Sequence, residues 1–244
     1  VSASSLSCLR FSTLRRNSKS SSEAWVLVKT ENPAGTSGLN FNMRKEPFND
    51  VRIRKAIAFM YDRIKFNDKL FFNAYLPIDS YFPGTEFENP NNPKIRYNVD
   101  SAQRLLTEAG WKDKNKDGYL VKEGKVFELD LPFTKGMDRY LTIFQEDLKK
   151  VGVKLNLKEI DATTIFKLGN ERNFKIIPVN FSGLRIPNQE NTLESSTADA
   201  EGTTNWAGIK NPKLDELCKA YDTTFDVKAR IKILREIDII ACNE

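Results

Sequence analysis

Residues 126–180 read VFELDLPFTKGMDRYLTIFQEDLKKVGVKLNLKEIDATTIFKLGNERNFKIIPVN, and this stretch decides the fold. Apolar residues alternate along some segments, as in strands, and recur every three to four positions along others, as in helices. The pattern predicts a strand at 126–131, a helix at 138–151, a strand at 153–157, a helix at 163–168 and a strand at 174–180. A βαβαβ order favours parallel strands joined by right-handed crossovers. The expected fold class is therefore α+β with α/β-like βαβ units.

The carboxyl ends of these strands are the predicted place of ligand binding. Ligands of such sheets collect outside those ends, which here lead into residues 133–138, 161–163 and 181 onward. The last of these opens a loop of about 25 residues with little periodicity, and loops of that length are more often functional than plain connectors.

Two aromatic residues bracket this long loop. Phe181 precedes the loop, and Trp206 ends it with Asn205 beside it. Aromatic faces and amide groups around a cleft suit a ligand that has both apolar and amide character. The alternative, which the sequence leaves open, is that Trp206 fills the core beneath the loop.

Further elements are expected on both sides of the deciding stretch. The patterns predict strands at 25–29 and 39–43, helices at 51–61, 64–73, 100–109, 212–221 and 227–241, and a hairpin between 119–121 and 126–131. Residues 77–93 contain four prolines and are expected to form a long surface loop. Residues 1–24 hold nine serines, four basic residues and one acid. We expect them to be a disordered or non-fold tail, although the composition also resembles a transit peptide.

Composition excludes several classes of function. The chain has no histidine, which removes Ser-His-Asp and Cys-His catalysis and every zinc or haem site that needs an imidazole ligand. Outside residues 1–24 there are 34 basic and 32 acidic residues, a balance that lacks the charge pattern of a nucleic-acid-binding protein. No apolar run approaches the roughly 18 residues of a membrane-spanning helix. The three cysteines, Cys8, Cys218 and Cys242, cannot all pair with one another, so no disulfide framework is expected.

One short motif matches a calcium loop in part. Residues 113–118 read DKNKDG and fit the first six positions of an EF-hand loop. Position twelve is Gly124 where the loop needs a bidentate glutamate, and Glu123 falls one residue short. We therefore expect a structural turn, with a calcium-stabilised module as one alternative. The other alternative is a peptide-processing enzyme. Glu190 and Glu194 in the long loop could suggest the carboxylate pair of a hydrolase, but we expect them to be solvated loop acids.

Four stretches together resemble a known family. NMRKEPFNDVRIRKAIAFMYD at 42–62 and YNVDSAQRLLTEAGW at 97–111 are similar to two stretches of family 5 of the extracellular solute-binding proteins. These are the peptide- and nickel-binding components of bacterial ABC importers. QEDLKKVGV at 145–153 and NWAGIKNPKLDEL at 205–217 fit the same pattern. The resemblance covers residues 25–244 in order and looks most like the oligopeptide and microcin C-type subgroup.

The resemblance implies a fold and a function. The implied fold is the second lobe of a type II periplasmic-binding-protein-like structure, with a mixed sheet and flanking helices over 25–244; the first lobe, the final return segment and an export signal are not recognised. The implied function is capture of oligopeptides or peptide-like solutes in the periplasm or another extracytoplasmic space, for delivery to ABC permease subunits in the inner membrane. We expect no enzymatic activity, no cofactor, no metal, no nucleic acid and a monomeric protein.

Six residues are expected to contact the ligand: Asn42, Arg44, Phe181, Ser182, Asn205 and Trp206. Many oligopeptide binders of this family carry an acid soon after the strand that here ends near Phe181, where the acid meets the amino terminus of the ligand. This sequence has SGLRIPNQ at 182–189, without that acid. The resemblance therefore does not extend to the usual recognition of a free amino terminus.

The turn at residues 113–118 yields a first prediction. Because the bidentate ligand at position twelve is missing, calorimetric titration with calcium at millimolar concentration should show no heat of binding to a specific site. A stoichiometric binding isotherm, together with a melting temperature that EDTA lowers, would contradict it.

Overall fold

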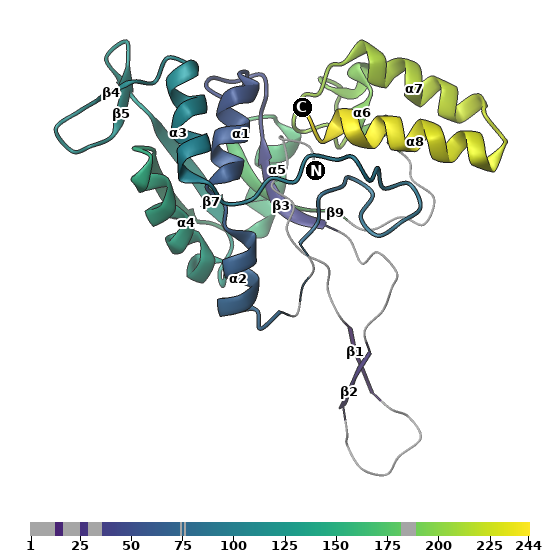
Figure 1. Ribbon diagram of the computed structural model, residues 1–244, viewed down its shortest axis with the longest axis horizontal. Helices are drawn as coiled ribbons and strands as arrows, with labels where there is room; N and C mark the ends of the chain where they lie inside the picture. The colour runs from purple at the N-terminus through teal and green to yellow at the C-terminus, as the bar shows by residue number, and fades with distance from the viewer. Residues whose placement is uncertain (1–12, 17–24, 29–35, 74, 76, 182–188) are drawn as a thin grey trace.

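The structure is a computed structural model that describes residues 13–16, 25–28, 36–73, 75, 77–181 and 189–244. Its element order alternates strands and helices through the middle of the chain and ends in helices (Figure 1). None of the helices in these ranges is long and apolar enough to cross a membrane.

The deciding stretch forms the predicted βαβαβ order. β7 (Glu128–Phe133) and β8 (Lys154–Glu159) pair in parallel, with Leu129 opposite Leu155, and α4 (Asp138–Lys150) connects them. α5 (Ala162–Asn170) then leads to β9 (Ile176–Phe181). The prediction of a parallel pair with a helical crossover is confirmed.

The final strand of that stretch shows why the sheet is mixed. β9 lies beside β7, but its hydrogen-bonded partner is β3 (Thr36–Phe41), which runs antiparallel to it. In this register Thr36 is opposite Phe181 and Phe41 is opposite Ile176. Residues that follow β3 in the sequence therefore lie at the amino end of β9.

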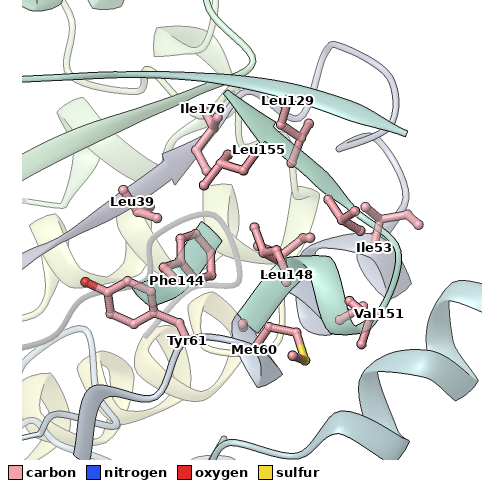
Figure 2. Packing of buried hydrophobic residues seen from close by; sticks show 14 of the residues in the cluster. Leu39, Ile53, Met60, Tyr61, Leu129, Phe144, Leu148, Val151, Leu155 and Ile176 are labelled. Carbon is pink, nitrogen blue, oxygen red and sulfur yellow. The ribbon is translucent and has the colours of Figure 1, made fainter. Parts of the chain in front are cut away.

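Helices cover both faces of these strands. α1 (Val51–Phe59), α3 (Val99–Glu108) and α4 bury their apolar faces in the main core, as Figure 2 shows for Ile53, Phe144 and Leu148. α5 covers the opposite face of β9, because Ile176 belongs to the main core whereas Ile177 packs with Ile165. This alternation is the period of two that a strand buried on both faces requires.

Side chains that cap helices explain where several helices begin. Asp50 accepts a hydrogen bond from Arg52 N at the start of α1, and Asn98 accepts one from Ser101 N at the start of α3. Asp62 does the same for α2 (Arg63–Leu70). Such residues satisfy backbone N–H groups that have no partner within the helix, so the predicted helix starts at 51 and 100 are confirmed to within one residue.

Smaller strands complete the architecture. β4 (Asp113–Lys114), β5 (Leu120–Lys122) and β6 (Lys125–Val126) form a short antiparallel sheet. The predicted hairpin is thus real but shorter, because residues 128–133 pair with β8 instead. Within the turn at 113–118, Asn115 Oδ1 accepts hydrogen bonds from Asp117 N and Tyr119 N at 3.1 and 2.9 Å. The amide oxygen that a calcium ion would need is used by the turn itself.

The predicted tail at 1–24 contains one described strand. β1 (Thr13–Arg16) pairs antiparallel with β2 (Trp25–Val28), so regular structure begins before the predicted boundary at residue 24. Residues 1–12, which include Cys8, and residues 17–24 lie outside the described part of the chain.

The carboxyl-terminal helices form a second core. α6 (Glu190–Leu193) and a 3-10 turn (Ser195–Thr197) precede α7 (Pro212–Thr223) and α8 (Val227–Ala241), which pack against each other. Their core residues include Leu193, Leu214, Cys218 and Leu234. Cys218 is buried in this core, and Figure 1 shows these helices on the far side of β3 and β9 from α4.

A buried carboxylate fastens the loop at 77–93 to this second core. Asp238 of α8 has no exposed surface. Its oxygens accept hydrogen bonds from Ser80 Oγ at 2.9 and 3.0 Å, from Tyr81 N at 2.6 Å, from Asn89 N at 2.7 Å and from Asn92 Nδ2 at 2.6 Å. Buried N–H and O–H groups need hydrogen-bond acceptors, and a loop without helix or strand has no regular backbone partners to provide them. The carboxylate of Asp238 supplies these acceptors.

Asp238→Ala should therefore lower the free energy of unfolding by about 3–5 kcal/mol, because several buried donors lose their acceptor at once. Chemical denaturation would measure the change. Glu236→Ala is the matched control on the same helix, at an exposed position, and should change stability by no more than about 0.5 kcal/mol. Equal effects of the two substitutions would show that the carboxylate does not hold the loop.

Candidate ligand-binding site

The structure brings four of the six predicted site residues together. Asn42 and Arg44 follow β3, and Asn205 and Trp206 end the long loop; Arg44 bonds to all three of the others. Because β3 is antiparallel to β9, this group lies at the amino end of β9. Phe181 is the last residue of β9, at its other end; its side chain and Ser182 lie outside what the structure describes.

Asn42 is fully buried and bonded on both sides of its amide. Its Nδ2 donates to the carbonyl oxygens of Arg172 and Phe174, at 2.9 and 3.1 Å. Its Oδ1 accepts from the backbone and side chain of Arg44, at 3.2 and 3.1 Å. The amide thus ties the end of β3 to the segment between α5 and β9.

Arg44 joins the two cores. Its guanidinium donates to the carbonyl oxygens of Trp206 at 3.0 Å, Asn205 at 3.3 Å and Ala198, and to the carboxylate of Asp199 at 2.8 Å. Hydrogen bonds from Lys210 and from Arg44 lower the pKa of Asp199 to about 2. Asp199 is therefore an anion at any pH at which the protein would work.

Asn205 is a buried amide that shapes the end of the long loop. Its Nδ2 donates to the carbonyl oxygens of Glu194 and Ile209, at 3.1 and 3.0 Å. Its Oδ1 accepts from the backbone N–H groups of Gly208 and Ile209, at 3.0 and 2.9 Å. All of these partners are protein groups, so Asn205 holds the backbone of the loop in place.

The indole of Trp206 packs between α5 and β9. A Cβ atom at Gly169 would lie 2.7 Å from two atoms of the indole, and Phe166 meets the ring edge-on at a centroid distance of 5.6 Å. The ring adjoins the small cluster of Ile165, Phe174, Ile177 and Val179. Its Nε1 is buried with no hydrogen-bond partner among the described residues. These contacts support the core role that the sequence left open, while contact with a ligand stays a prediction for Trp206 as for the other five residues.

A pocket of about 260 Å³ lies at the other end of the strands. We call it the aromatic pocket. Its lining comes from the first half of β3, the last half of β9, the residues just after β7, and α2 and α4: Ser37, Gly38, Leu39, Tyr61, Arg63, Phe66, Phe71, Tyr75, Thr134, Met137, Tyr140, Pro178, Val179 and Asn180. Thr134 and Met137 fall within the predicted segment 133–138. A pocket therefore adjoins the carboxyl ends of β7 and β9, where the sequence predicts ligand binding, and binding there stays a prediction.

The aromatic residues of this pocket were missed by sequence reasoning. Phe66 and Phe71 lie on the segment predicted as a helix at 64–73, and Tyr140 lies on the helix predicted at 138–151. The one available signal was the density of aromatic residues between Phe59 and Phe82. Such density predicts a core as readily as a pocket, because rings serve both.

Arg63, the one cationic side chain among the described residues that line the aromatic pocket, is hydrogen-bonded to other groups of the protein. Arg63 donates to the carbonyl oxygen of Ile95 at 2.7 Å, to that of Ile78, and to Asp79. Burial opposes ionisation of Asp79, but Arg96 and Arg63 outweigh it and hold the pKa of this carboxyl below its usual value. The charge of Arg63 is therefore matched by a carboxylate, and the pocket offers mainly aromatic and aliphatic surface to a ligand.

Neither described cysteine resembles a catalytic nucleophile. Burial raises the pKa of Cys218 to about 12, with carboxylates nearby adding to the effect, and burial raises that of Cys242 to about 11. Both thiols are thus protonated at neutral pH, and the thiolate is the reactive form. Within the described residues, no group of three or more acids or cysteines is arranged to hold a metal ion.

The contact between Gly169 and Trp206 can be tested directly. Ala for Gly within a helix normally raises stability by roughly 0.5–1 kcal/mol. Gly169→Ala should instead lower the free energy of unfolding by about 1–3 kcal/mol, because the indole must move to admit a methyl group. Denaturation monitored by tryptophan fluorescence would measure it. Asn170→Ala, at the exposed next position, is the control and should be close to neutral; a stabilising Gly169→Ala would show that the ring does not press on α5.

Comparison with known proteins shows which sequences this chain resembles. A family model described as bacterial extracellular solute-binding proteins, family 5 middle region, matches residues 11–203, beginning inside the predicted tail. The oligopeptide-binding protein AppA of Bacillus subtilis is 28% identical over 208 residues, covering 82% of this chain and 38% of AppA. The YejA protein of Escherichia coli is 25% identical over 224 residues, covering 78% of this chain and 37% of YejA.

The fold agrees with these sequence matches. The solved structure of Bacillus subtilis AppA in complex with a nonapeptide superimposes with a TM-score of 0.76 at 26% identity, covering 86% of this chain and 43% of AppA. The chain thus spans about two fifths of the length of the relatives it matches. The α+β fold with a mixed sheet is that of a lobe of a periplasmic binding protein, as predicted. With a family model that matches most of its residues, the chain belongs to family 5 of the bacterial extracellular solute-binding proteins.

Proposed function

We propose that this chain forms one lobe of the substrate-binding component of a bacterial ABC importer, and that it captures oligopeptides or peptide-like solutes outside the cytoplasmic membrane. The observation that carries the proposal is the aromatic pocket at the carboxyl ends of β7 and β9, in a chain whose relative AppA is named for oligopeptide binding. The proposed setting is the periplasm or another extracytoplasmic space, and the proposed partners are a peptide and the permease subunits of the importer.

The peptide would bind at the carboxyl ends of β7 and β9, beside the aromatic pocket. An extended peptide is held largely by backbone hydrogen bonds, which give affinity with little discrimination among side chains. Closure of a second lobe over the ligand would remove water and create a surface for the permease. In this scheme Phe181 and Ser182 contact the ligand, and Trp206 packs on the face of β9 that α5 covers.

The group around Arg44 has a different part in the proposal. Asn42, Arg44 and Asn205 use their polar atoms on protein partners at the amino end of β9. We propose that they keep the two cores of the lobe in a fixed relation, so that the lobe moves as one body when it closes.

Binding is favoured over catalysis by the chemistry of the side chains. The chain has no histidine, and burial keeps Cys218 and Cys242 protonated. A peptide-processing enzyme would need an activated nucleophile or a pair of acids in unequal environments. The proposal is therefore a binding lobe without enzymatic activity, and we propose that it acts as a monomer.

The experiment is a titration of the isotope-labelled chain with peptides of two to ten residues, followed by NMR chemical shifts. Because this chain is one wall of the proposed cleft, we expect weak binding, with shifts centred on the aromatic pocket and the end of β9. The same peptides should bind more tightly to a chimera in which this chain replaces the matching segment of AppA. Mass spectrometry should recover the bound peptide intact.

Two results would overturn the proposal. One is a folded chimera that binds no peptide in this length range when the isolated chain also shows no shift. The other is peptide that is recovered cleaved, since that would favour the enzyme reading.

A further inference from the structure

The carboxyl-terminal end of α2 carries an unusual local structure next to the aromatic pocket. Phe72 and Asn73 both have left-handed backbone conformations, with φ of 49° and 57°. Asparagine tolerates this region, but a bulky residue such as phenylalanine rarely adopts it. The Phe72 side chain is also 85% exposed, so no burial of its ring offsets the strain. Strain that packing does not explain points to a function of the segment.

A buried amide holds this segment against α2. Asn67 donates from Nδ2 to the carbonyl oxygen of Tyr75 at 2.8 Å, and its Oδ1 accepts from Tyr75 N at 3.1 Å. The carbonyl oxygen of Asn67 accepts from Asn73 N at 2.9 Å. Phe71 and Tyr75, whose rings meet edge-on at 4.9 Å, both line the aromatic pocket. Asn67 therefore fixes the backbone of Tyr75, whose ring meets that of Phe71 in the pocket wall, and the exposed Phe72 is the next residue in the chain after Phe71.

The size and lining of the pocket define what it can hold. An apolar cavity of about 150 Å³ is large enough to hold benzene, whereas pockets for whole drug-sized ligands begin at roughly 300 Å³. At about 260 Å³ the aromatic pocket suits one large side chain rather than a complete ligand. The partly exposed rings of Phe71 and Tyr140 supply faces and edges for another ring, and Arg63 is matched by Asp79.

We propose that the aromatic pocket selects a bulky apolar side chain, preferably an aromatic one, of the bound peptide, and that Phe72 closes over that side chain. This inference rests on the proposed function, since it names the ligand group that one pocket of the lobe accepts. Most of the peptide is then held through its backbone, and this single pocket adds a preference at one position.

The test uses small probes that carry the side chain without a long peptide. N-acetyl-phenylalaninamide should shift NMR signals of residues lining the aromatic pocket, and it should bind about tenfold or more tightly than N-acetyl-alaninamide, the gain expected from burying a phenyl ring. The peptides Ala-Phe-Ala and Ala-Ala-Ala should show the same order of affinity.

Two exposed phenylalanines make a matched pair of variants. Phe72→Ala should weaken binding of N-acetyl-phenylalaninamide by about fivefold, as for loss of an interface anchor. Phe225→Ala should leave it unchanged, because Phe225 is equally exposed, at 87%, but lies in the α7–α8 connection at the end of the molecule remote from α4 (Figure 1). Both positions are exposed, so both variants should fold.

A third variant fills the pocket. Ser37 lines the pocket and shares a strand face with Leu39. Ser37→Phe should abolish binding of the phenylalanine probe while the melting temperature stays near that of the unchanged chain.

The outcomes separate this inference from the proposed function. Equal binding of the phenylalanine and alanine probes, or unchanged binding by a folded Ser37→Phe variant, overturns the inference even if peptides bind. Equal effects of Phe72→Ala and Phe225→Ala overturn the role of Phe72. Selective binding of N-acetyl-phenylalaninamide with no binding of any peptide, Ala-Phe-Ala included, keeps only the preference of the pocket for an aromatic group and overturns its role in peptide capture together with the proposed function.

Discussion

The hydrogen bonds of the Arg44 guanidinium are the interaction on which the arrangement of the two cores depends. It stands where β3 ends, between the sheet with its helices and the core formed by α6, α7 and α8, and its donors reach carbonyl oxygens of Ala198, Asn205 and Trp206. An arginine supplies five N–H donors in a fixed plane, which suits a junction where several carbonyl groups converge without a ladder to pair them. Gly208 must lack a side chain here, because a Cβ atom would meet the guanidinium.

This junction and the aromatic pocket lie at opposite ends of the same two strands. The register of β3 and β9 makes that separation unavoidable, since the residue after β3 is Asn42 and the residue opposite the start of β3 is Phe181. Polar side chains that are saturated by protein partners gather at one end. The end that faces the proposed ligand offers rings and a matched arginine. In the proposed function, rigidity and recognition therefore belong to different ends of the lobe.

Much of the secondary structure could be predicted from the sequence. Helices such as α8, predicted at 227–241 and found at Val227–Ala241, follow from apolar spacing and from a capping aspartate at 226. The parallel pairing of β7 with β8 follows from the helix between them. Family membership followed from four short stretches, because each combines helix caps and turns with core positions in a fixed order. These features are local, and local sequence is enough to specify them.

The tertiary structure alone decided which side chains meet. The sequence grouped Asn42 and Arg44 with Phe181 as ligand contacts, whereas the antiparallel course of β3 puts them at opposite ends of β9. The sequence also gives no sign that Phe71, Tyr75 and Tyr140 meet, whereas the fold brings them together in the pocket at the ends of β7 and β9. Strand direction and the packing of a helix against a distant strand depend on contacts between residues far apart in the chain. Periodicity reports which face of an element is apolar and carries no information about which distant element that face will meet.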